Sequence, residues 1–525
     1  MRRRFLAVFL GLCVSVTAQT HPAAKTSPRA GARAKPSPAL PPKLVLAIVV
    51  DQFRYDYLTR FRSEFVGGFK RMLDQGAVFT NANYDAAPTV TAVGHSTFLT
   101  GATPAMSGIV GNTWWDRTTA KSVTSVSDDK TKLLGGNGNV SGSSPERLLV
   151  STVGDELKIS GKGGKVIGIS LKDRSAILPA GHMADGAYWF DGQSGAFVSS
   201  TYYFAELPGW VRDYNAGRPA DKYAGLDWMG HKMPAVGPQL YNAVDASPFG
   251  DELLQALAIR AMSAENLGAG PKTDLLAVSY SSVDYVGHQD GPDSPEIHDM
   301  VKRVDKLIGA LIDAAEARAG RGRVLVAFTA DHGSTPVPEV NQKRKMPGGR
   351  LAWNTYRAAV EKALNDKFGT GQWISFSADG VIYFSPDPIP GKKLDMAEVQ
   401  KVAADTIRVQ PHIARAYTRS QLEQGALGRD PVDTRVRNGF NPARSPDVFT
   451  VTEPYYMFIA SGTTHGSPYS YDTHVPVIFL GSARIKAGTY AGAVGVEDIA
   501  PTLATLLGIE TPSGNMGRAL AEMLK

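Results

Sequence analysis

Four runs of apolar and β-branched residues predict strands that are buried on both faces. The runs are "KLVLAIVVDQ", "KVIGISLKDR", "DLLAVSYSSVD" and "RVLVAFTADH", and they end at Asp51, Lys172, Asp284 and Asp331. Apolar runs of this kind are typical of a covered, parallel sheet. A fifth run, "VPVIFLG", follows His474.

Between the third and fourth runs, residues 296–320 carry apolar positions with the period of a helix. These positions share one face: Ile297, Val301, Val304, Leu307, Ile308, Leu311 and Ile312. Strands that alternate with such helices predict an α/β fold, with a mainly parallel sheet sandwiched by helices. Ligands bind such sheets at the carboxyl ends of the strands. We therefore expect the polar residues that end the runs to share one edge.

Two long stretches do not follow this alternation. Residues 113–250 hold most of the tryptophans and many Gly and Tyr residues, and residues 336–450 mix short elements with Pro-rich turns. Both are expected to be insertions in a catalytic domain that spans residues 43–525. They either form a cap over the sheet edge or decorate the periphery.

The N-terminus predicts export. Residues 1–18 place three arginines before a short apolar run that ends in "VTA", the pattern of a signal cleaved after Ala18. Lipid attachment at Cys13 is the alternative, but Leu12 stands where a small residue is expected. Residues 19–42 are rich in Pro, Ala and Lys and predict a flexible leader. No segment reaches the length of about 20 apolar residues that spans a membrane. A periplasmic or secreted protein is expected.

Composition narrows the chemistry that an exported chain of this kind can perform. The chain is 43% hydrophobic and 20% charged, which excludes a disordered protein. Its formal charge of +6 falls to about +3 without the signal arginines, and no basic run suggests a nucleic-acid partner. Cys13 is the only cysteine, so metal ligands in the mature chain are limited to His, Asp and Glu.

Candidate metal ligands cluster after the predicted strands. "SVDYVGH" contains Asp284 and His288 four residues apart, and "TADHG" contains Asp331 and His332. A buried carboxylate is costly without a partner, and a metal ion offsets that cost. Taken singly, either pair is equally consistent with surface hydrogen bonds. Together with Asp51 and one later histidine, His465 or His474, they form a set suited to two zinc ions. Two metal ions can stabilise the attacking and leaving oxygens of a phosphoryl transfer.

Hydroxyl and cationic side chains add to this set. In "DAAPTVTAVGHSTFLTG", Thr91 stands at a predicted helix start, where its oxygen either caps the helix or attacks a phosphoryl group. Lys172 and Arg174 are two positions apart at a strand end and can point the same way toward phosphate oxygens. The alternative is a solvated, charged turn.

These motifs resemble the alkaline phosphatase superfamily, in its type I phosphodiesterase and nucleotide pyrophosphatase branch. The resemblance runs from about residue 43 to the C-terminus. Its motifs are "VVDQFRYDYL", "PTVTAVGHSTFLTGATPAMSGIVGNTWWD", "SVDYVGH", "TADHG" and "TTHGSPYSYDTHVPVIFLG". The K-x-R followed by "LPAGH" is similar to the exported, zinc-dependent alkaline phosphatases of that branch.

The resemblance implies a role for each candidate residue. Thr91 is implied as the nucleophile, and Asn112, Lys172 and Arg174 as the residues that bind the transferred phosphate. The implied ligands of the nucleophile-side zinc are Asp51, Thr91, Asp331 and His332, and those of the leaving-group zinc are Asp284, His288 and His465. His465 is preferred to His474, which is expected to brace the site or to pack. No role is assigned to His182.

The function expected from these residues is an alkaline phosphatase that hydrolyses small phosphate monoesters through a phosphothreonine intermediate. Lys172, Arg174 and Asn112 suit the three free oxygens of a monoester, whereas a diester's second organic group would prefer an apolar wall. A phosphodiesterase or nucleotide pyrophosphatase with the same site is the first alternative. A sulfatase is disfavoured because its C/S-x-P-x-R motif is missing, and an exported phosphate- or metal-binding protein is disfavoured by the nucleophile. No motif indicates an oligomeric state.

Overall fold

The fold is that of a computed structural model that describes residues 11, 15, 40–136 and 140–525. Apart from residues 11, 15 and 40–42, the predicted signal and leader lie outside the described residues. Residues 40–525 form one compact unit. In the part of the chain that the structure describes, no helix is long and apolar enough to cross a membrane.

The unit is built on one eleven-stranded sheet. Its order is β22-β2-β21-β14-β1-β13-β8-β9-β10-β6-β7. The strands are β1 (Leu44–Val50), β2 (Ala77–Phe79), β6 (Ser127–Leu134), β7 (Ser141–Ser143), β8 (Gly163–Ser170), β9 (Gly186–Asp191), β10 (Ala196–Ser200), β13 (Thr273–Tyr280), β14 (Val324–Thr329), β21 (Val477–Leu480) and β22 (Gly488–Tyr490). The four runs that predicted buried strands form β1, β8, β13 and β14, and the fifth forms β21.

The register of the central strands aligns their carboxyl ends. β1 lies parallel to β13 and β14, with Val50 opposite Tyr280 and Val49 opposite Thr329. β8 continues this pattern beside β13. β21 runs antiparallel to β14, with Val477 opposite Thr329. The segment before β21 therefore reaches the same edge as the residues that follow β1, β13 and β14.

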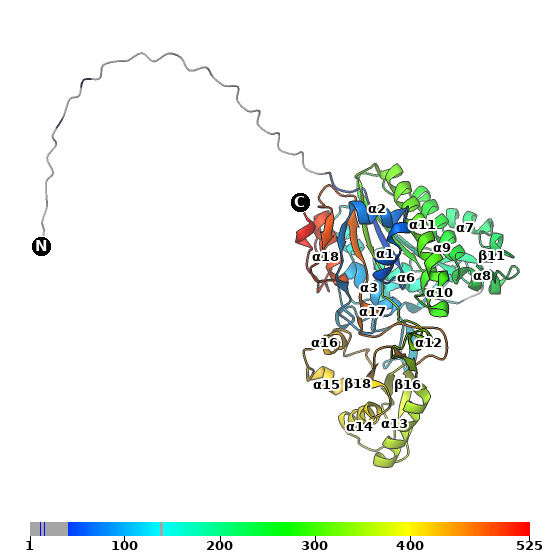
Figure 1. The fold of residues 1–525 in the computed structure, drawn as a ribbon, viewed down its shortest axis with the longest axis vertical. Coiled ribbons are helices and arrows are strands. Elements are labelled where there is room, and N and C mark those ends of the chain that lie inside the picture. Colours follow the sequence, from blue (N-terminus) through cyan, green and yellow to red (C-terminus); the bar gives the residue numbers. More distant parts are fainter. Residues whose placement is uncertain (1–10, 12–14, 16–39, 137–139) are drawn as a thin grey trace. The chain divides into compact units, whose positions relative to one another are not determined.

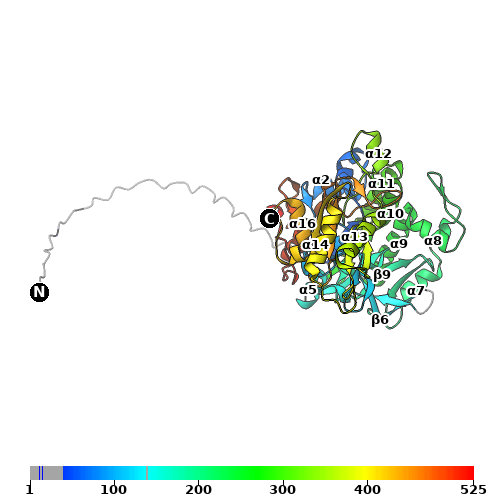
Figure 2. The same ribbon diagram turned by 90° about the horizontal axis from the view of Figure 1, so that it is seen from below.

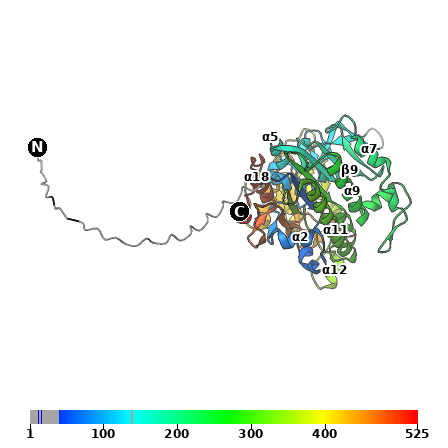
Figure 3. The same ribbon diagram turned by 90° about the horizontal axis from the view of Figure 1, so that it is seen from above.

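Helices cover both faces of the sheet, as the periodicity predicts. One layer contains α2 (Gly68–Gln75), α9 (Pro248–Ala264), α10 (Ser282–Asp290) and α11 (Pro295–Ala319), and the other contains α3 (Thr91–Thr100), α5 (Val153–Ile159), α6 (Asp173–Ala180) and α18 (Ile499–Leu507). Figure 3 shows α5 and α18 on one side and α2 and α11 on the other. α11 buries its predicted apolar face, including Ile297, Val304 and Ile308. The mainly parallel α/β sandwich is confirmed.

Residues 113–250, expected to be an insertion, also supply strands to the main sheet, including the predicted run that forms β8. They contribute β6, β7, β8, β9 and β10 to the main sheet. β8 is a central parallel strand, while β9 and β10 form an antiparallel hairpin that extends the sheet. The short, Gly- and aromatic-rich runs hid this extension in the sequence. This stretch therefore enlarges the sheet instead of only lying over its edge.

A separate small sheet is formed by residues 374–452, most of which belong to the stretch 336–450. Its order is β16-β17-β19-β18, and it packs against two helices. The elements are α13 (Trp353–Phe368), β16 (Ile374–Ala378), β17 (Val381–Phe384), α14 (Met396–Arg408), β18 (Ile413–Thr418) and β19 (Val448–Thr452). Figure 1 shows α13, α14, β16 and β18 beyond the end of the main sheet marked by α3 and α17 (Ser470–Thr473), and Figure 2 views α13 and α14 from that end.

Candidate functional site

Three buried carboxylates gather at the shared sheet edge. Asp51 directly follows β1, and Asp331 comes two residues after β14. Asp284 does not end β13 as the sequence suggested, because the strand stops at Tyr280 and Asp284 lies in the first turn of α10. All three side chains are nearly inaccessible to solvent. Charged groups buried this deeply require cationic partners.

Asp51, Asp331 and His332, here called the buried set, converge on one point. His332 Nε2 lies 3.5 Å from Asp51 Oδ1 and 3.3 Å from Asp331 Oδ2. These three buried atoms have no hydrogen-bond partner among the described residues. Two carboxylate oxygens and an imidazole nitrogen that face one another without hydrogens between them form a donor set suited to a metal ion.

Asp284, His288 and His465, here called the cavity-side set, form a second group. His288 Nε2 and His465 Nε2 lie 3.2 Å and 3.6 Å from the same oxygen, Asp284 Oδ1. Their Nδ1 atoms are held by backbone carbonyls, that of Thr463 for His288 and that of Thr89 for His465. With Nδ1 occupied in this way, Nε2 is the nitrogen presented to a metal ion.

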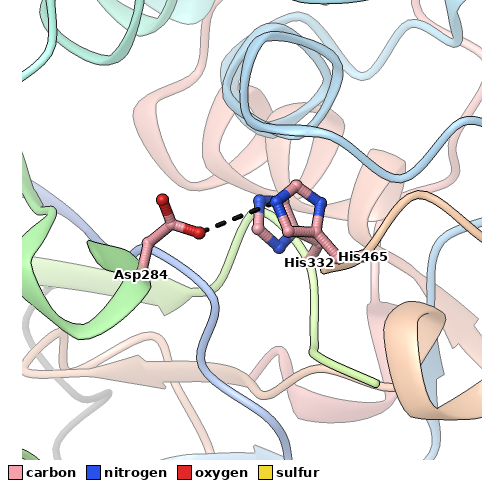
Figure 4. Close-up of side chains that lie close together, drawn as sticks. All are labelled: Asp284, His332 and His465. Carbon is pink, nitrogen blue, oxygen red and sulfur yellow. Dashed lines mark ion pairs between the residues drawn. The ribbon is translucent and has the colours of Figure 1, made fainter. Parts of the chain in front are cut away.

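The two sets meet at His332. Its ring stacks on that of His465 with the ring centres 3.4 Å apart. Figure 4 shows the two rings side by side with Asp284 directed toward them. By distance, Asp284, His332 and His465 also form a possible metal-binding triplet. By distance, His332 can therefore belong to either set. The resemblance instead implies that His332 belongs to the buried set and that His288 joins Asp284 and His465. His288 Nε2 also lies within 3.2 Å of Asp284 Oδ1, so His288 and His465 are both placed near this carboxylate.

Burial sets the protonation states of these groups. Burial lowers the pKa of His332 to about 3 and, with the neighbouring imidazoles, lowers the pKa of His465 well below its usual value. Both rings are thus neutral at neutral pH and offer a lone pair. Burial, together with Asp51, raises the pKa of Asp331 well above its ordinary value. A cation beside Asp331 is needed to keep it ionised.

Lys172 supplies one cation to both sets. Its Nζ donates to Asp51 Oδ2 at 2.7 Å and to Asp284 Oδ2 at 2.5 Å. Burial alone would lower the pKa of this ammonium, but Asp284 and Asp51 outweigh that effect and raise it. The group therefore stays charged. A buried ammonium between the two sets is placed to meet a bound anion.

The structure corrects the reason given for pairing Lys172 with Arg174. β8 ends at Ser170, Lys172 is the N-cap of α6, and Arg174 lies in the first turn of that helix, so strand parity does not apply. The Arg174 side chain is 26% exposed. Its buried Nε has no hydrogen-bond partner among the described residues. The Nε–H of Arg174, two residues after Lys172, is therefore available to donate a hydrogen bond to a ligand.

Thr91 and Asn112 lie beside each other at the start of α3. Val90 occupies the N-cap position and Thr91 is the first helical residue, so helix capping does not account for the Thr91 hydroxyl. Asn112 Oδ1 accepts a hydrogen bond of 2.8 Å from the backbone N–H of Ala92. This bond fixes the Asn112 amide next to Thr91, although the two residues are far apart in the sequence.

Two residues at the site were missed in the sequence. His95 lies one turn after Thr91, with Nδ1 2.9 Å from the Thr91 carbonyl and 3.2 Å from Asp331 Oδ2. Its four-residue spacing from Thr91 on a predicted helix was the available signal. Gln52 donates its backbone N–H to Asp331 and its side-chain Nε2 to Asp284. Only its position next to Asp51 pointed to this bridging role.

His474 and His182, the other two histidines considered in the sequence, have no contact with these ligand sets among the hydrogen bonds of the described residues. His474 Nε2 contacts the Thr80 carbonyl at 3.0 Å, and its ring stacks on Tyr55. It therefore packs beside the site, as expected. The His182 carbonyl accepts a hydrogen bond from Tyr202.

A cavity of about 440 Å³ opens beside the cavity-side set. Asn112, His288 and His465 line one wall. Much of the rest is apolar, and the small sheet contributes Phe376, Val381, Tyr383 and Phe449 to it. Gly111, Asn112 and Thr113 line the cavity, but Trp114 and Trp115, which follow them, are not among the described residues that line it.

Comparison with known proteins places this arrangement in context. A family model for type I phosphodiesterase / nucleotide pyrophosphatase matches residues 45–475. The alkaline phosphatase PhoV of Synechococcus elongatus is 36% identical over 517 residues, which cover 92% of this chain and 93% of PhoV. The alkaline phosphatase PafA of Elizabethkingia meningoseptica is 35% identical, with coverage of 92% and 94%.

Solved structures agree with these similarities. Wild-type PafA matches with a TM-score of 0.86 at 33% identity, covering 93% of this chain and 100% of its own. A PafA variant, with one threonine replaced by serine and an asparagine, a lysine and an arginine replaced by alanine, matches equally well. Murine ectonucleotide pyrophosphatase / phosphodiesterase 5 shares the fold at 16% identity and a TM-score of 0.54.

Proposed function

Because this chain belongs to the type I phosphodiesterase / nucleotide pyrophosphatase family and is an alkaline phosphatase, we propose that it hydrolyses phosphate monoesters at a two-zinc site through a phosphothreonine intermediate. The observation that carries the monoester assignment is the buried Lys172 ammonium between Asp51 and Asp284. A second cation, Arg174, follows two residues later. Two cations beside the metal ligands suit a dianionic phosphoryl group with three free oxygens.

Two zinc ions would be held by residues from both sets. Asp51, Asp331 and His332, with Thr91, would hold one, and Asp284, His288 and His465 the other. Imidazole and carboxylate donors without cysteine suit zinc. When bound, zinc ions supply positive charge that favours an ionised nucleophile and a negatively charged departing oxygen.

The chain's own residues perform the transfer in two steps. Thr91 Oγ, after losing its proton to solvent, attacks phosphorus; the bond from phosphorus to the alcohol oxygen breaks, the alcohol takes up a proton from water, and phosphothreonine remains. Water then attacks phosphorus, the bond to Thr91 Oγ breaks, and inorganic phosphate leaves. Asn112, Lys172 and Arg174 hold the phosphoryl oxygens during both steps. Asn112 is suited to this because its amide is fixed beside Thr91 through Ala92.

The PafA variant supports this assignment of roles. Its four replaced positions are a threonine, an asparagine 21 residues later, a lysine and an arginine two residues after the lysine. Thr91, Asn112, Lys172 and Arg174 have the same residue types and the same two spacings. The four residues of this chain therefore correspond in type and order to a set that was altered together in a relative.

A phosphodiesterase is the second candidate, since the site adjoins an apolar cavity. That cavity, however, borders two proposed ligands of the leaving-group zinc, His288 and His465, together with Asn112, and Thr91, Lys172 and Arg174 are not among its lining residues in the described part of the chain. It thus serves the leaving group, which both ester classes have. The second organic group of a diester would instead have to lie against Lys172 and Arg174.

The test is the ratio of kcat/KM for an aryl phosphate monoester and a diester with the same aryl group, measured on the purified, zinc-loaded protein. A strong preference for the monoester is expected. A preference for the diester would keep Thr91 and the metal ligands but would make the protein a phosphodiesterase.

We also propose that residues 1–18 are a cleaved signal and that the enzyme acts in the periplasm or outside the cell. Small phosphate esters are the proposed substrates. N-terminal sequencing of the protein exported from a Gram-negative host should begin at Gln19. An intact N-terminus on active protein that stays in the cytoplasm would contradict this.

A further inference from the structure

The small sheet has two apolar faces, and its own helices cover only one. Side chains alternate between the faces of a strand. Ile382, Phe384 and Val448 belong to a buried cluster with residues of α13 and α14. The residues between and beside them, Val381, Tyr383 and Phe449, line the cavity instead.

The pairing of the strands makes the second face continuous. Phe376 of β16 lies opposite Tyr383 of β17, with ring centres 5.8 Å apart. Val381 of β17 lies opposite Phe449 of β19. Cross-strand neighbours of this kind form one surface. The cavity wall is therefore a block of apolar and aromatic side chains held by a sheet, not by a loop.

The cavity borders Asn112 and, of the proposed zinc ligands, only members of the cavity-side set. Among the residues assigned to the two zinc ions, His288 and His465 line the cavity, and both belong to the cavity-side set. That set is assigned to the departing oxygen. The group attached to that oxygen is consequently directed into the cavity, whose volume is in the range of small-molecule sites.

The charge of the cavity restricts this group further. No lysine or arginine is among its lining residues in the part of the chain that the structure describes, whereas Asp379 and Asp472 are. A leaving group that carries its own phosphate or carboxylate finds no cation there. A neutral, apolar group gains by leaving water.

We propose that this cavity binds the alcohol part of the substrate and makes the enzyme selective for phosphate monoesters of large, uncharged, apolar alcohols. The inference rests on the proposed function, since it assigns the cavity-side set to the leaving group. Phe376, Tyr383 and Phe449 are the residues that determine this specificity.

The experiment compares ethyl, butyl and hexyl phosphate on the zinc-loaded, full chain. The leaving oxygen is chemically equivalent in all three, so intrinsic reactivity is nearly constant. Burial of each methylene should raise kcat/KM by about threefold, and hexyl phosphate should exceed ethyl phosphate by at least about tenfold. A six-carbon ester that ends in a carboxylate should lose this gain. Equal values along the series would overturn the proposal.

Two variants locate the effect. Ala378→Trp fills the cavity and should reduce the hexyl-to-ethyl ratio to near one, and Phe449→Ala removes part of the wall and should lower it several-fold. Phe368→Ala is the matched control, because Phe368 belongs to α13 and packs on the opposite face. An unchanged ratio in both cavity variants would overturn the proposal, and Ala378→Trp serves if Phe449→Ala does not fold.

Inhibition by inorganic phosphate distinguishes the cavity proposal from the proposed function, because inorganic phosphate has no alcohol group to enter the cavity. Its inhibition constant should be the same in wild type and in both cavity variants. Hydrolysis of ethyl phosphate without any chain-length effect would overturn the cavity proposal alone. Failure to hydrolyse any of the monoesters, with diesters turned over, would overturn the proposed function.

Discussion

The two ligand sets stand at the same sheet edge and are mostly buried, but they differ at one ligand, His288. Asp51, Asp331 and His332 are each at most 1% exposed. The His288 side chain is 37% exposed and, with His465, lines the cavity. One half of the centre is therefore closed to solvent and should hold its metal ion tightly. The other half reaches solvent and the cavity through His288, so its metal ion and the leaving group should exchange more readily.

The largest effect is expected from removing the nucleophile next to the buried set. Thr91→Ala should lower kcat for an aryl phosphate monoester by roughly 10⁴-fold or more, because no hydroxyl remains to attack phosphorus. Zinc content at saturating zinc, measured by atomic absorption, should stay near two ions per chain, because Asp51, Asp331 and His332 remain to hold the nucleophile-side ion. Thr91→Ser is the control and should retain activity. Substantial turnover by Thr91→Ala would remove Thr91 from the mechanism.

The difference between the two ligand sets is tested by comparing zinc loss from the Asp331→Asn and His288→Ala variants. Replacing a direct ligand should weaken metal binding by more than the roughly 10–100-fold typical of the partners of ligands. Asp331→Asn should lose the tightly held ion. His288→Ala should lose the ion that a chelator removes first from wild type, because its ligand is open to solvent.

The zinc content of each variant is measured at increasing chelator concentrations. His298→Ala is the control, because His298 is exposed and pairs with Glu64. Simultaneous loss of both ions from both variants would mean that the two halves do not differ.

Lys172 contacts both sets, so its removal shows what they share. Lys172→Ala with Arg174→Ala should lower kcat/KM for a monoester by about 10³-fold and for a diester by about tenfold or less. A diester has fewer free oxygens for these cations to hold. Lys158→Ala is the control, since Lys158 pairs with Asp185 away from the site. Equal losses for the two substrates would assign the pair a structural role.

The smallest effect is expected from a change at Gln52, because one substitution can remove its hydrogen bond to the cavity-side set and keep its hydrogen bond to the buried set. Gln52→Leu removes the side-chain bond to Asp284 and keeps the backbone bond to Asp331. Zinc affinity on the cavity side should fall by about tenfold, with the buried side unchanged. Zinc titration with two resolved affinities measures this. A change confined to the tighter site would reverse the assignment.

Local pattern was enough to predict much of this edge. A buried strand followed by an acidic residue located Asp51 and Asp331, and the register of β1, β13 and β14 explains why the prediction worked. The residues alone left His465 and His474 open, and only the resemblance preferred His465. The chain before the antiparallel β21 reaches the edge that follows the parallel strands, which explains why His465 lies there.

Features that depend on tertiary contacts were not predicted. The hydrogen bond from Gln52 to Asp331 and the approach of His95 to Asp331 join residues distant in the sequence, and no periodicity predicts them. The strand positions of Lys172 and Arg174 were misjudged because β8 ends earlier than its apolar run suggested. The cavity wall requires β16, β17 and β19 to pair, and only that pairing brings Phe376, Tyr383 and Phe449 together.

The antiparallel course of β21 also has a consequence for how the enzyme is made. The proposed ligands extend from Asp51 to His465, and the strand that fixes the last of them follows only at Val477–Leu480. A ribosome must therefore complete most of the coding sequence before the catalytic centre can assemble. A nascent or truncated chain that lacks this strand has no complete ligand set, so premature termination yields inactive protein instead of a partly working phosphatase.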